Sequence, residues 1–337
     1  MSNSKGLPRR KFLKNTAMTI GAVTTGLFSS KSLQANADVK LENFMSPRNA
    51  IILSVSLENI DQKNDVIEKV IERIDRMASH NPDVICIPEA FATSVETAQT
   101  IDGPIITKFC LLAKKYNSYI ICPLHLKKNG KTFNSAVLID RKGKIAGQYD
   151  KIYPTEGECD QGITPGNNPP PIFHTDFGII GILICYDINW IEAWKSLKDQ
   201  GAEIVFWTAA YPGGRMLPSY AWMFNYYVVG CSRRDPASIY DISGDLLDKS
   251  GTYENWAFAT LNFEKILCEI DFHNKKVKAI RKKYGNKVRI KYYHDEDWVT
   301  IESCSPDLTI KQLIDEYGLL IHSDYIIRSE KYQEKFR

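Results

Sequence analysis

Three residues with complementary chemistry follow apolar stretches of the sequence: a carboxylate at Glu89, an ammonium at Lys151 and a thiol at Cys185. A thiol is a strong nucleophile only as thiolate, which a neighbouring ammonium stabilises and a carboxylate can generate by taking the proton. The ammonium also stabilises the charge that builds up when a thiolate attacks an amide or nitrile carbon. The carboxylate could then protonate departing ammonia and activate the water that hydrolyses the thioester. These residue types suit nucleophilic hydrolysis of a carbon–nitrogen bond.

Each of the three residues stands at the end of a predicted strand. The strands are VICIP before Glu89, KIAGQYD before Lys151 and IIGILI before Cys185. Ligands of layered α/β proteins bind in the crevice beyond strand ends, so the three side chains could meet there. Taken singly, each has an ordinary structural interpretation, respectively a charge at a helix N-terminus, a solvated surface lysine and a buried core cysteine. Spacing alone does not show that they converge.

The elements that would position these residues alternate between apolar runs and helical patterns. Near-continuous apolar strands beside helices, with hairpins between them, predict a mixed sheet covered by helices, of class α/β or four-layer α+β. Helices are expected at residues 66–78, 107–116 and 191–199. Strands are expected at residues 51–57, 84–88, 119–124, 133–140, 144–150, 173–178, 179–187, 204–210, 226–232 and 257–263.

The segments VICIPEAF, GQYDKIYPTEGE and GILICYDINW closely resemble, in this order and at these separations, the three catalytic segments of the nitrilase superfamily of carbon–nitrogen hydrolases. The resemblance implies a four-layer α-β-β-α sandwich. It implies Glu89 as the catalytic base, Lys151 as the stabiliser of charge and Cys185 as a pre-activated nucleophile. No cofactor and no metal are implied, and the scattered histidines form no zinc motif.

The resemblance also implies residues that support the triad. A second glutamate after the lysine, which positions the substrate and holds Lys151, matches Glu158 best, with Glu156 as the competing assignment. The backbone N–H of Tyr186 would join Lys151 in stabilising the oxyanion. Asp187 is interpreted as structural, because it would order the turn that presents the thiol.

The residues after the cysteine bear on the substrate. Tyr186 and Asp187 match the Tyr-Asp pair that many amidases and carbamoyl hydrolases have after the cysteine, where nitrilases usually have Trp-Glu. The segment KIYPTEGE, in contrast, also resembles the lysine segment of nitrilases. We therefore predict hydrolysis of a small amide or N-carbamoyl compound with release of ammonia, with conversion of a nitrile to an acid as the alternative. A catalytically inactive binding protein on the same fold is the alternative from another class. Aromatic candidates for the pocket wall are Trp190, Trp207, Tyr211, Trp222 and Phe224.

The first 37 residues have the order of a signal peptide. Arg9 and Arg10 lie in PRRKFLK, a short apolar run extends over residues 17–28, and the small-residue site Ala-Asn-Ala ends at Ala37. The twin arginines resemble the twin-arginine export signal, so we expect a periplasmic or secreted protein. The apolar run is shorter than the roughly 20 residues that span a bilayer, so no stable membrane anchor is expected.

The remaining chain is divided into a catalytic domain at residues 46–283 and a C-terminal extension at residues 284–337, which lacks a clear core of its own and is a candidate for a subunit interface. Without the first 37 residues, 37 Lys and Arg stand against 40 Asp and Glu. That balance gives no electrostatic reason to expect nucleic acid as a partner. The expected partners are a small-molecule substrate and further copies of the chain in a homodimer or larger homo-oligomer.

Overall fold

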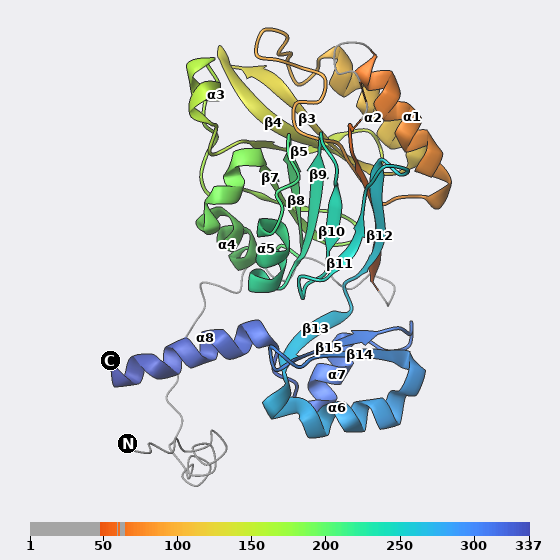
Figure 1. Ribbon diagram of the computed structural model, residues 1–337, viewed down its shortest axis with the longest axis vertical. Coiled ribbons are helices and arrows are strands. Elements are labelled where there is room, and N and C mark those ends of the chain that lie inside the picture. Colours follow the sequence, from red (N-terminus) through yellow and green to blue (C-terminus); the bar gives the residue numbers. More distant parts are fainter. Residues whose placement is uncertain (1–47, 59, 61–64) are drawn as a thin grey trace, which may run out of the picture. The chain divides into compact units, whose positions relative to one another are not determined.

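The computed structural model describes residues 48–58, 60 and 65–337 (Figure 1). The predicted signal peptide, residues 1–37, lies outside the described residues. In the part of the chain that is described, no helix is both long and apolar enough to cross a membrane.

In the described residues, the catalytic domain contains two six-stranded mixed sheets. The first sheet has the order β12-β1-β2-β3-β4-β5 and the second β11-β10-β9-β8-β7-β6. Neighbours are parallel within β1-β2-β3 and within β7-β8-β9. The strands of the first sheet are β1 (Asn49–Val55), β2 (Val84–Cys86), β3 (Tyr119–Lys128), β4 (Lys131–Ile139), β5 (Ile145–Asp150) and β12 (Trp256–Asn262). Those of the second are β6 (Ile172–His174), β7 (Ile179–Ile184), β8 (Ile204–Ala209), β9 (Tyr227–Ser232), β10 (Ser238–Tyr240) and β11 (Leu246–Lys249).

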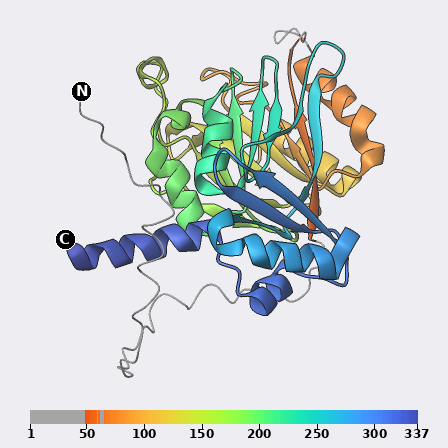
Figure 2. The ribbon, with the colours of Figure 1, turned by 60° about the horizontal axis from the view of Figure 1, so that its bottom comes forward.

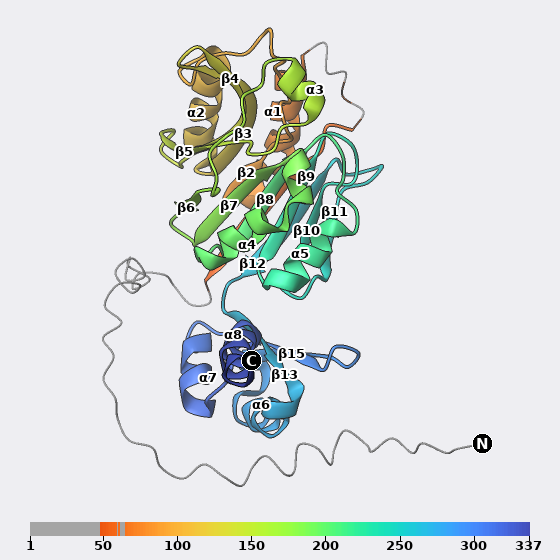
Figure 3. The same ribbon diagram turned by 90° about the vertical axis from the view of Figure 1, so that its left-hand side faces the viewer.

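Helices cover the outer face of each sheet (Figures 1 and 3). Helices α1 (Val66–Met77) and α2 (Pro104–Tyr116) share a hydrophobic core with the first sheet. Helices α4 (Ile191–Asp199) and α5 (Met216–Phe224) pack on the second sheet, and the short helix α3 (Glu156–Asp160) follows β5. The predicted α-β-β-α sandwich is therefore confirmed.

The apolar runs form strands that are buried on both faces. In β1, Ile52 packs between the two sheets whereas the next residue, Leu53, packs against the helices of the first sheet. In the segment that leads to Glu89, Val84 and Cys86 face the second sheet, and Ile85 faces the helices. Successive side chains of a strand point to opposite faces, so a strand with both faces buried reads as a continuous apolar run.

Strand β9 lies against the first sheet and sets the position of one sheet on the other. Ser54 Oγ donates to the Gly230 carbonyl at 3.0 Å. Cys231 Sγ donates to the carbonyls of Val55 and Cys86 at 3.2 and 3.1 Å. These contacts lie one and two residues from the end of β9 and place that end beside the segment that follows β2.

The predicted strands and helices are found with small shifts of their ends. The hairpin expected across residues 140–143 is the antiparallel pair β4 and β5, and the helix expected at residues 191–199 is α4. Strands β10 and β11 were not predicted, because they are short and their sequence lacks a long apolar run.

The C-terminal extension has a hydrophobic core, so the expectation that it lacks one is wrong. Strands β13, β15 and β14, in that order, form a three-stranded sheet packed against helices (Figure 2). The predicted boundary at 283/284 falls at the end of α6, and both α6 and β13 belong to this core. We call residues 265–337 the C-terminal lobe. Its elements are β13 (Lys265–Glu269), α6 (Ile270–Tyr284), β14 (Val288–Tyr293), β15 (Trp298–Ser303), α7 (Ile310–Tyr317) and α8 (His322–Gln333).

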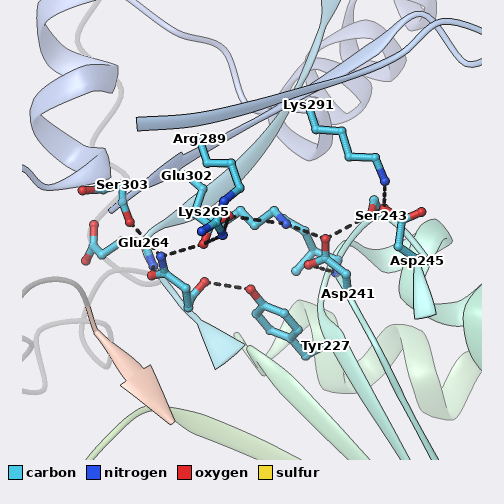
Figure 4. A network of polar contacts seen from close by, with 12 residues as sticks. Tyr227, Asp241, Ser243, Asp245, Glu264, Lys265, Arg289, Lys291, Glu302 and Ser303 are labelled. Carbon is cyan, nitrogen blue, oxygen red and sulfur yellow. Dashed lines mark hydrogen bonds and ion pairs between the residues drawn. The ribbon is translucent and has the colours of Figure 1, made fainter. Parts of the chain in front are cut away.

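A network of polar contacts connects this lobe to the catalytic domain (Figure 4). Lys265 Nζ contacts the carboxylate of Asp241 at 2.5 Å, and both side chains are largely buried. Lys291 pairs with the more exposed Asp245 at 2.6 Å. Asn262 Nδ2 donates to Glu302 Oε1 at 3.0 Å. The lobe is therefore joined to the catalytic domain by paired charges and amides as well as by apolar contacts such as the stacking of Trp298 on Trp222.

Replacing Lys265 with Met should leave the buried Asp241 carboxylate without its cation and lower the free energy of unfolding by about 3–5 kcal/mol. The matched variant Lys291→Met breaks an exposed pair and should cost about 1 kcal/mol or less. Urea unfolding followed by tryptophan fluorescence measures both. Equal losses in the two variants would contradict the assignment of Lys265–Asp241 as the buried connection.

Candidate active site

Lys151 lies at the centre of the site, where two carboxylates meet its ammonium. Its Nζ is 3.0 Å from Glu89 Oε1 and 2.7 Å from Glu158 Oε2. The residue is buried, with 1% of its surface exposed. Glu89 follows β2, Lys151 follows β5 and Glu158 belongs to α3. The structure thus brings together three of the residues that the sequence singled out.

Asn134 of β4 completes this cluster, and its role was not predicted. Its Nδ2 donates to Glu89 Oε1 and to Glu158 Oε1, each at 2.8 Å. Asn134 and Lys151 therefore bridge the same two carboxylates and close a ring of four side chains. A buried asparagine inside the apolar strand FNSAVLI was the available signal, because a buried amide needs hydrogen-bond partners.

The charges of this ring stabilise one another. Burial alone would lower the pKa of Lys151, but neighbouring groups, the Glu89 and Glu158 carboxylates among them, outweigh it and the pKa is raised. Burial opposes ionisation of Glu158 as well, yet Lys151 lowers the pKa of that carboxyl below its ordinary value. Lys151 is therefore an ammonium and Glu158 a carboxylate at neutral pH.

Glu158 is fixed by the capping of its own helix. Thr155 Oγ1 accepts from the Glu158 backbone N–H at 3.2 Å, and Glu158 Oε2 accepts from the Thr155 N–H at 2.7 Å. This reciprocal pair is a capping box, which orients the glutamate side chain back along the chain. The same Oε2 contacts Lys151. The competing residue Glu156 is exposed, so Glu158 is the glutamate that the fold places on the lysine.

Cys185 begins a short 3₁₀ helix, Cys185–Asn189, directly after β7. Its φ of 47° lies in the left-handed region, which non-glycine residues adopt at a cost and which is often found at functional sites. Its carbonyl accepts from Trp207 Nε1 at 2.9 Å. The Ala210 N–H after β8 and the Glu89 side chain both influence the pKa of the Cys185 thiol. A thiol from the second sheet is thus placed beside a carboxylate from the first.

Asp187 orders the turn that presents this thiol, as predicted. Its buried carboxylate accepts from Tyr149 OH at 2.7 Å, from the Ile184 N–H at 2.8 Å and from the Tyr153 N–H at 2.9 Å. One side chain therefore ties the end of β7 to the segment around Lys151. This connection fixes Cys185 relative to the lysine.

The resting state of Cys185 differs from the pre-activated thiolate that the sequence pattern predicted. Burial and the neighbouring Glu89 carboxylate raise the pKa of Cys185 to about 12, and Lys151 and the Ala210 N–H offset only part of that rise. The protein on its own accordingly holds a thiol beside a carboxylate. Thiolate would form only as Glu89 takes the proton.

Arg233, which follows β9, is a further charged group at the site that sequence reasoning missed. Its Nε donates to the Glu89 carbonyl at 2.8 Å, and its Nη2 is 3.8 Å from Glu89 Oε2. Glu89 and Glu158 carry two negative charges, and Lys151 and Arg233 carry two positive charges. With a neutral thiol at Cys185, the charges of the site therefore sum to zero.

The aromatic candidates fall into two groups. Trp207 supports Cys185, Tyr211 lies on Trp207 with ring centres 5.3 Å apart, and Trp190 stacks on Tyr153 at 4.1 Å and contacts Tyr186 at 5.1 Å. Trp222 instead stacks on Trp298 of the C-terminal lobe, and Phe224 packs on Tyr220 and Tyr226. Trp222 and Phe224 were therefore wrong as wall residues. The oxyanion role of the Tyr186 N–H stays a prediction.

In residues 48–58, 60 and 65–337 there is no group of three or more His, Cys, Asp or Glu side chains arranged to hold a metal ion. All eight cysteines lie in this part of the chain and are free thiols.

Comparison with protein families matches residues 55–266 to the model described as "Carbon-nitrogen hydrolase". The match includes Glu89, Lys151, Glu158 and Cys185. It ends at the first residues of β13, so most of the C-terminal lobe lies outside it.

Curated relatives include a beta-ureidopropionase of Arabidopsis thaliana, which is 30% identical over 210 residues and is matched by 56% of this chain and 51% of its own length. A citrullinase of Francisella tularensis is 27% identical over 186 residues, covering 51% of this chain and 65% of that protein. The chain thus spans about half to two thirds of the length of these relatives.

Solved structures share the fold. A nitrilase-superfamily protein of Saccharomyces cerevisiae gives a TM-score of 0.57 at 17% identity, covering 71% of this chain and 95% of that chain. An amidase from Nesterenkonia sp. gives 0.55 at 16% identity, covering 64% of this chain and 90% of that chain. At these identities the likeness concerns the fold alone.

Replacing Glu89 with Gln should increase the rate at which iodoacetamide alkylates Cys185, even though it removes the base. The substitution takes away a negative charge that raises the pKa of the thiol and leaves Lys151 in place, so the thiolate fraction at pH 8 grows by about tenfold for each unit by which the pKa falls. Peptide mass spectrometry of timed samples measures the rate, with the exposed Cys304 as internal reference. A slower reaction in the variant would show that Glu89 activates the thiol in the free enzyme.

Proposed function

Because the chain belongs to the carbon–nitrogen hydrolase family, whose model matches residues 55–266, we propose that it hydrolyses a non-peptide carbon–nitrogen bond through a thioester on Cys185. The observation that carries this proposal is the buried Lys151 ammonium held between the Glu89 and Glu158 carboxylates, with the Cys185 thiol beside the Glu89 carboxylate that raises its pKa. A nucleophile, its base and a fixed cation are thereby in contact.

In the proposed first half-reaction, Cys185 Sγ attacks the carbonyl carbon as Glu89 accepts the thiol proton. The Lys151 ammonium and the Tyr186 N–H stabilise the negative charge on the substrate oxygen. Glu89 then returns the proton to the leaving nitrogen, which departs as ammonia and leaves a thioester. Proton transfer between Cys185 and Glu89 keeps the summed charge of the site unchanged, which is favourable where the groups are buried.

In the second half-reaction, Glu89 removes a proton from a water molecule that attacks the thioester carbon. The resulting intermediate collapses and expels the Cys185 sulfur, which takes back the proton, and the acid product leaves. Glu158 does not take part in proton transfer in this scheme. It keeps Lys151 charged and fixes its direction, because it contacts the ammonium and is itself held by the capping box.

We propose a small amide or an N-carbamoyl compound as the substrate. The Tyr-Asp sequence after Cys185 supports this choice, as do the names of the Arabidopsis and Nesterenkonia proteins, which refer to a ureido acid and an amidase. A nitrile is the second candidate because of the KIYPTEGE segment. The complete set of charged partners around Lys151 argues against the alternative of an inactive binding protein.

Export by the twin-arginine route and assembly into a homodimer or larger oligomer remain proposals that rest on the sequence. If Arg9 and Arg10 form the export signal, replacing both with Lys should retain the protein in the cytoplasm of a bacterial host that exports the unaltered chain. Cell fractionation and immunoblotting measure the distribution. Unchanged export of the variant would contradict the twin-arginine assignment.

The proposed chemistry is tested by ammonia release from a panel of amides, N-carbamoyl amino acids and nitriles. Cys185→Ala should abolish release, because no other group supplies the nucleophile, whereas Cys304→Ala should retain it because that exposed cysteine lies in the C-terminal lobe. Glu158→Gln should lower kcat by about 100-fold, because Lys151 loses one of its two fixed partners. The class that reacts fixes the substrate. No release from any compound would favour a binding protein.

A further inference from the structure

Glu89 is held from both sides by cations, and only one of them belongs to the predicted triad. Glu89 Oε1 accepts hydrogen bonds from Lys151 Nζ at 3.0 Å and from Asn134 Nδ2 at 2.8 Å. The other carboxylate oxygen, Oε2, makes neither of these contacts and lies 3.8 Å from Arg233 Nη2. Arg233 also holds the main chain of the same residue, because its Nε donates to the Glu89 carbonyl at 2.8 Å.

The position of Arg233 is tied to that of the nucleophile. The Arg233 N–H donates to the Ala209 carbonyl at 3.0 Å, and the N–H of the residue after Ala209, Ala210, lies beside the Cys185 thiol and lowers its pKa. Two consecutive residues at the end of β8 therefore hold the arginine and the thiol. Because Glu89 belongs to the first sheet and Cys185 to the second, Arg233 connects the base to the structure that fixes the nucleophile.

We propose that Arg233 is the positioning residue of Glu89, which it holds across the junction of the two sheets so that the carboxylate faces the Cys185 thiol. Its guanidinium also places a second positive charge beside the Glu89 carboxylate. This inference rests on the proposed function for its kinetic consequences, but its geometry does not depend on the substrate.

Several other groups face Glu89 and bear on any pH dependence. They come from each element packed around it: Asn134 on β4, Lys151 after β5, Glu158 in α3, Cys185 after β7, Tyr211 after β8 and His125 on β3. Among them only Lys151 is a fixed cation, because burial lowers the pKa of His125. Removing Arg233 therefore leaves Glu89 with one fixed cation instead of two.

The test compares Arg233→Gln, Arg233→Lys and the matched control Arg234→Gln, whose side chain is exposed and only reaches the Ala210 carbonyl. For Arg233→Gln we expect kcat/KM to be about 100-fold lower than in the unaltered enzyme. The fall of kcat/KM on the acidic side of its pH profile, the acid limb, should move by about one pH unit or more toward higher pH. Arg233→Lys keeps the charge but not the paired contacts, so it should keep the acid limb of the unaltered enzyme with about tenfold lower kcat/KM. Arg234→Gln should match the unaltered enzyme in both.

A merely structural role predicts a different pattern. It would lower the activity of both Arg233 variants through loss of folded protein, without moving the acid limb, and that result would overturn the proposal. If Arg233→Gln does not fold, Arg233→Lys still decides. A kcat/KM per folded Arg233→Lys molecule equal to that of the unaltered enzyme would overturn the positioning role, and a loss of about tenfold per folded molecule would support it.

A measurement without substrate separates this proposal from the proposed function. Iodoacetamide should alkylate Cys185 faster in Arg233→Gln than in the unaltered protein at pH 8, because a Glu89 carboxylate that is no longer held against the thiol raises its pKa less. The buried Cys231 should stay unreactive in both proteins, which excludes unfolding as the cause. An unchanged or slower rate would contradict the proposal. If the unaltered protein releases no ammonia but the alkylation rates differ as expected, the proposed function fails and the placement of Arg233 stands.

Discussion

The site depends on the pairing of the buried Lys151 ammonium with the carboxylates of Glu89 and Glu158. An unpaired charge in a protein interior costs several kcal/mol, and it is tolerated only where partners of opposite charge and hydrogen bonds are supplied. Glu89 and Glu158 supply the opposite charges. Asn134 holds the two carboxylates in place, because its Nδ2 donates to one oxygen of each. The same arrangement that makes the lysine stable also directs its ammonium and keeps Glu89 close to the thiol. Stability and chemistry are therefore consequences of one cluster.

The second constraint is that the base and the nucleophile belong to different sheets. Glu89, Asn134 and Lys151 belong to the first sheet or directly follow its strands, whereas Cys185 and Arg233 follow strands of the second. Their separation is set by contacts that cross between the sheets, such as Ser54 with Gly230, and by the hydrogen bonds of Asp187. The apolar core between the sheets gives the distance, and these directed bonds give the register. The chemistry thus depends on packing far larger than the site.

Much of this could be predicted from the sequence because apolar runs, strand ends and the three motif segments are local features. The sandwich, the hairpin of β4 and β5 and the contact of Lys151 with Glu89 follow the expected pattern. Asn134 and Arg233 were missed because their partner Glu89 is 45 and 144 residues away in the sequence. The apolar strand around Asn134 signals a buried amide but not the groups that it binds. The resting thiol was missed for a related reason, since the balance between burial, Glu89 and Lys151 depends on distances. The core of the C-terminal lobe was overlooked because β13 and α6 looked like the end of the catalytic domain.

The most direct test of the account is to trap the thioester. The substrate that releases ammonia is mixed with the enzyme, the reaction is quenched in acid within milliseconds to seconds, and the intact protein and its peptides are weighed by mass spectrometry. We predict an added mass equal to the acyl group, carried by the peptide that contains Cys185 and absent from Cys185→Ala. Steady release of ammonia with no adduct at any time, undiminished in Cys185→Ala, would contradict nucleophilic catalysis by this cysteine.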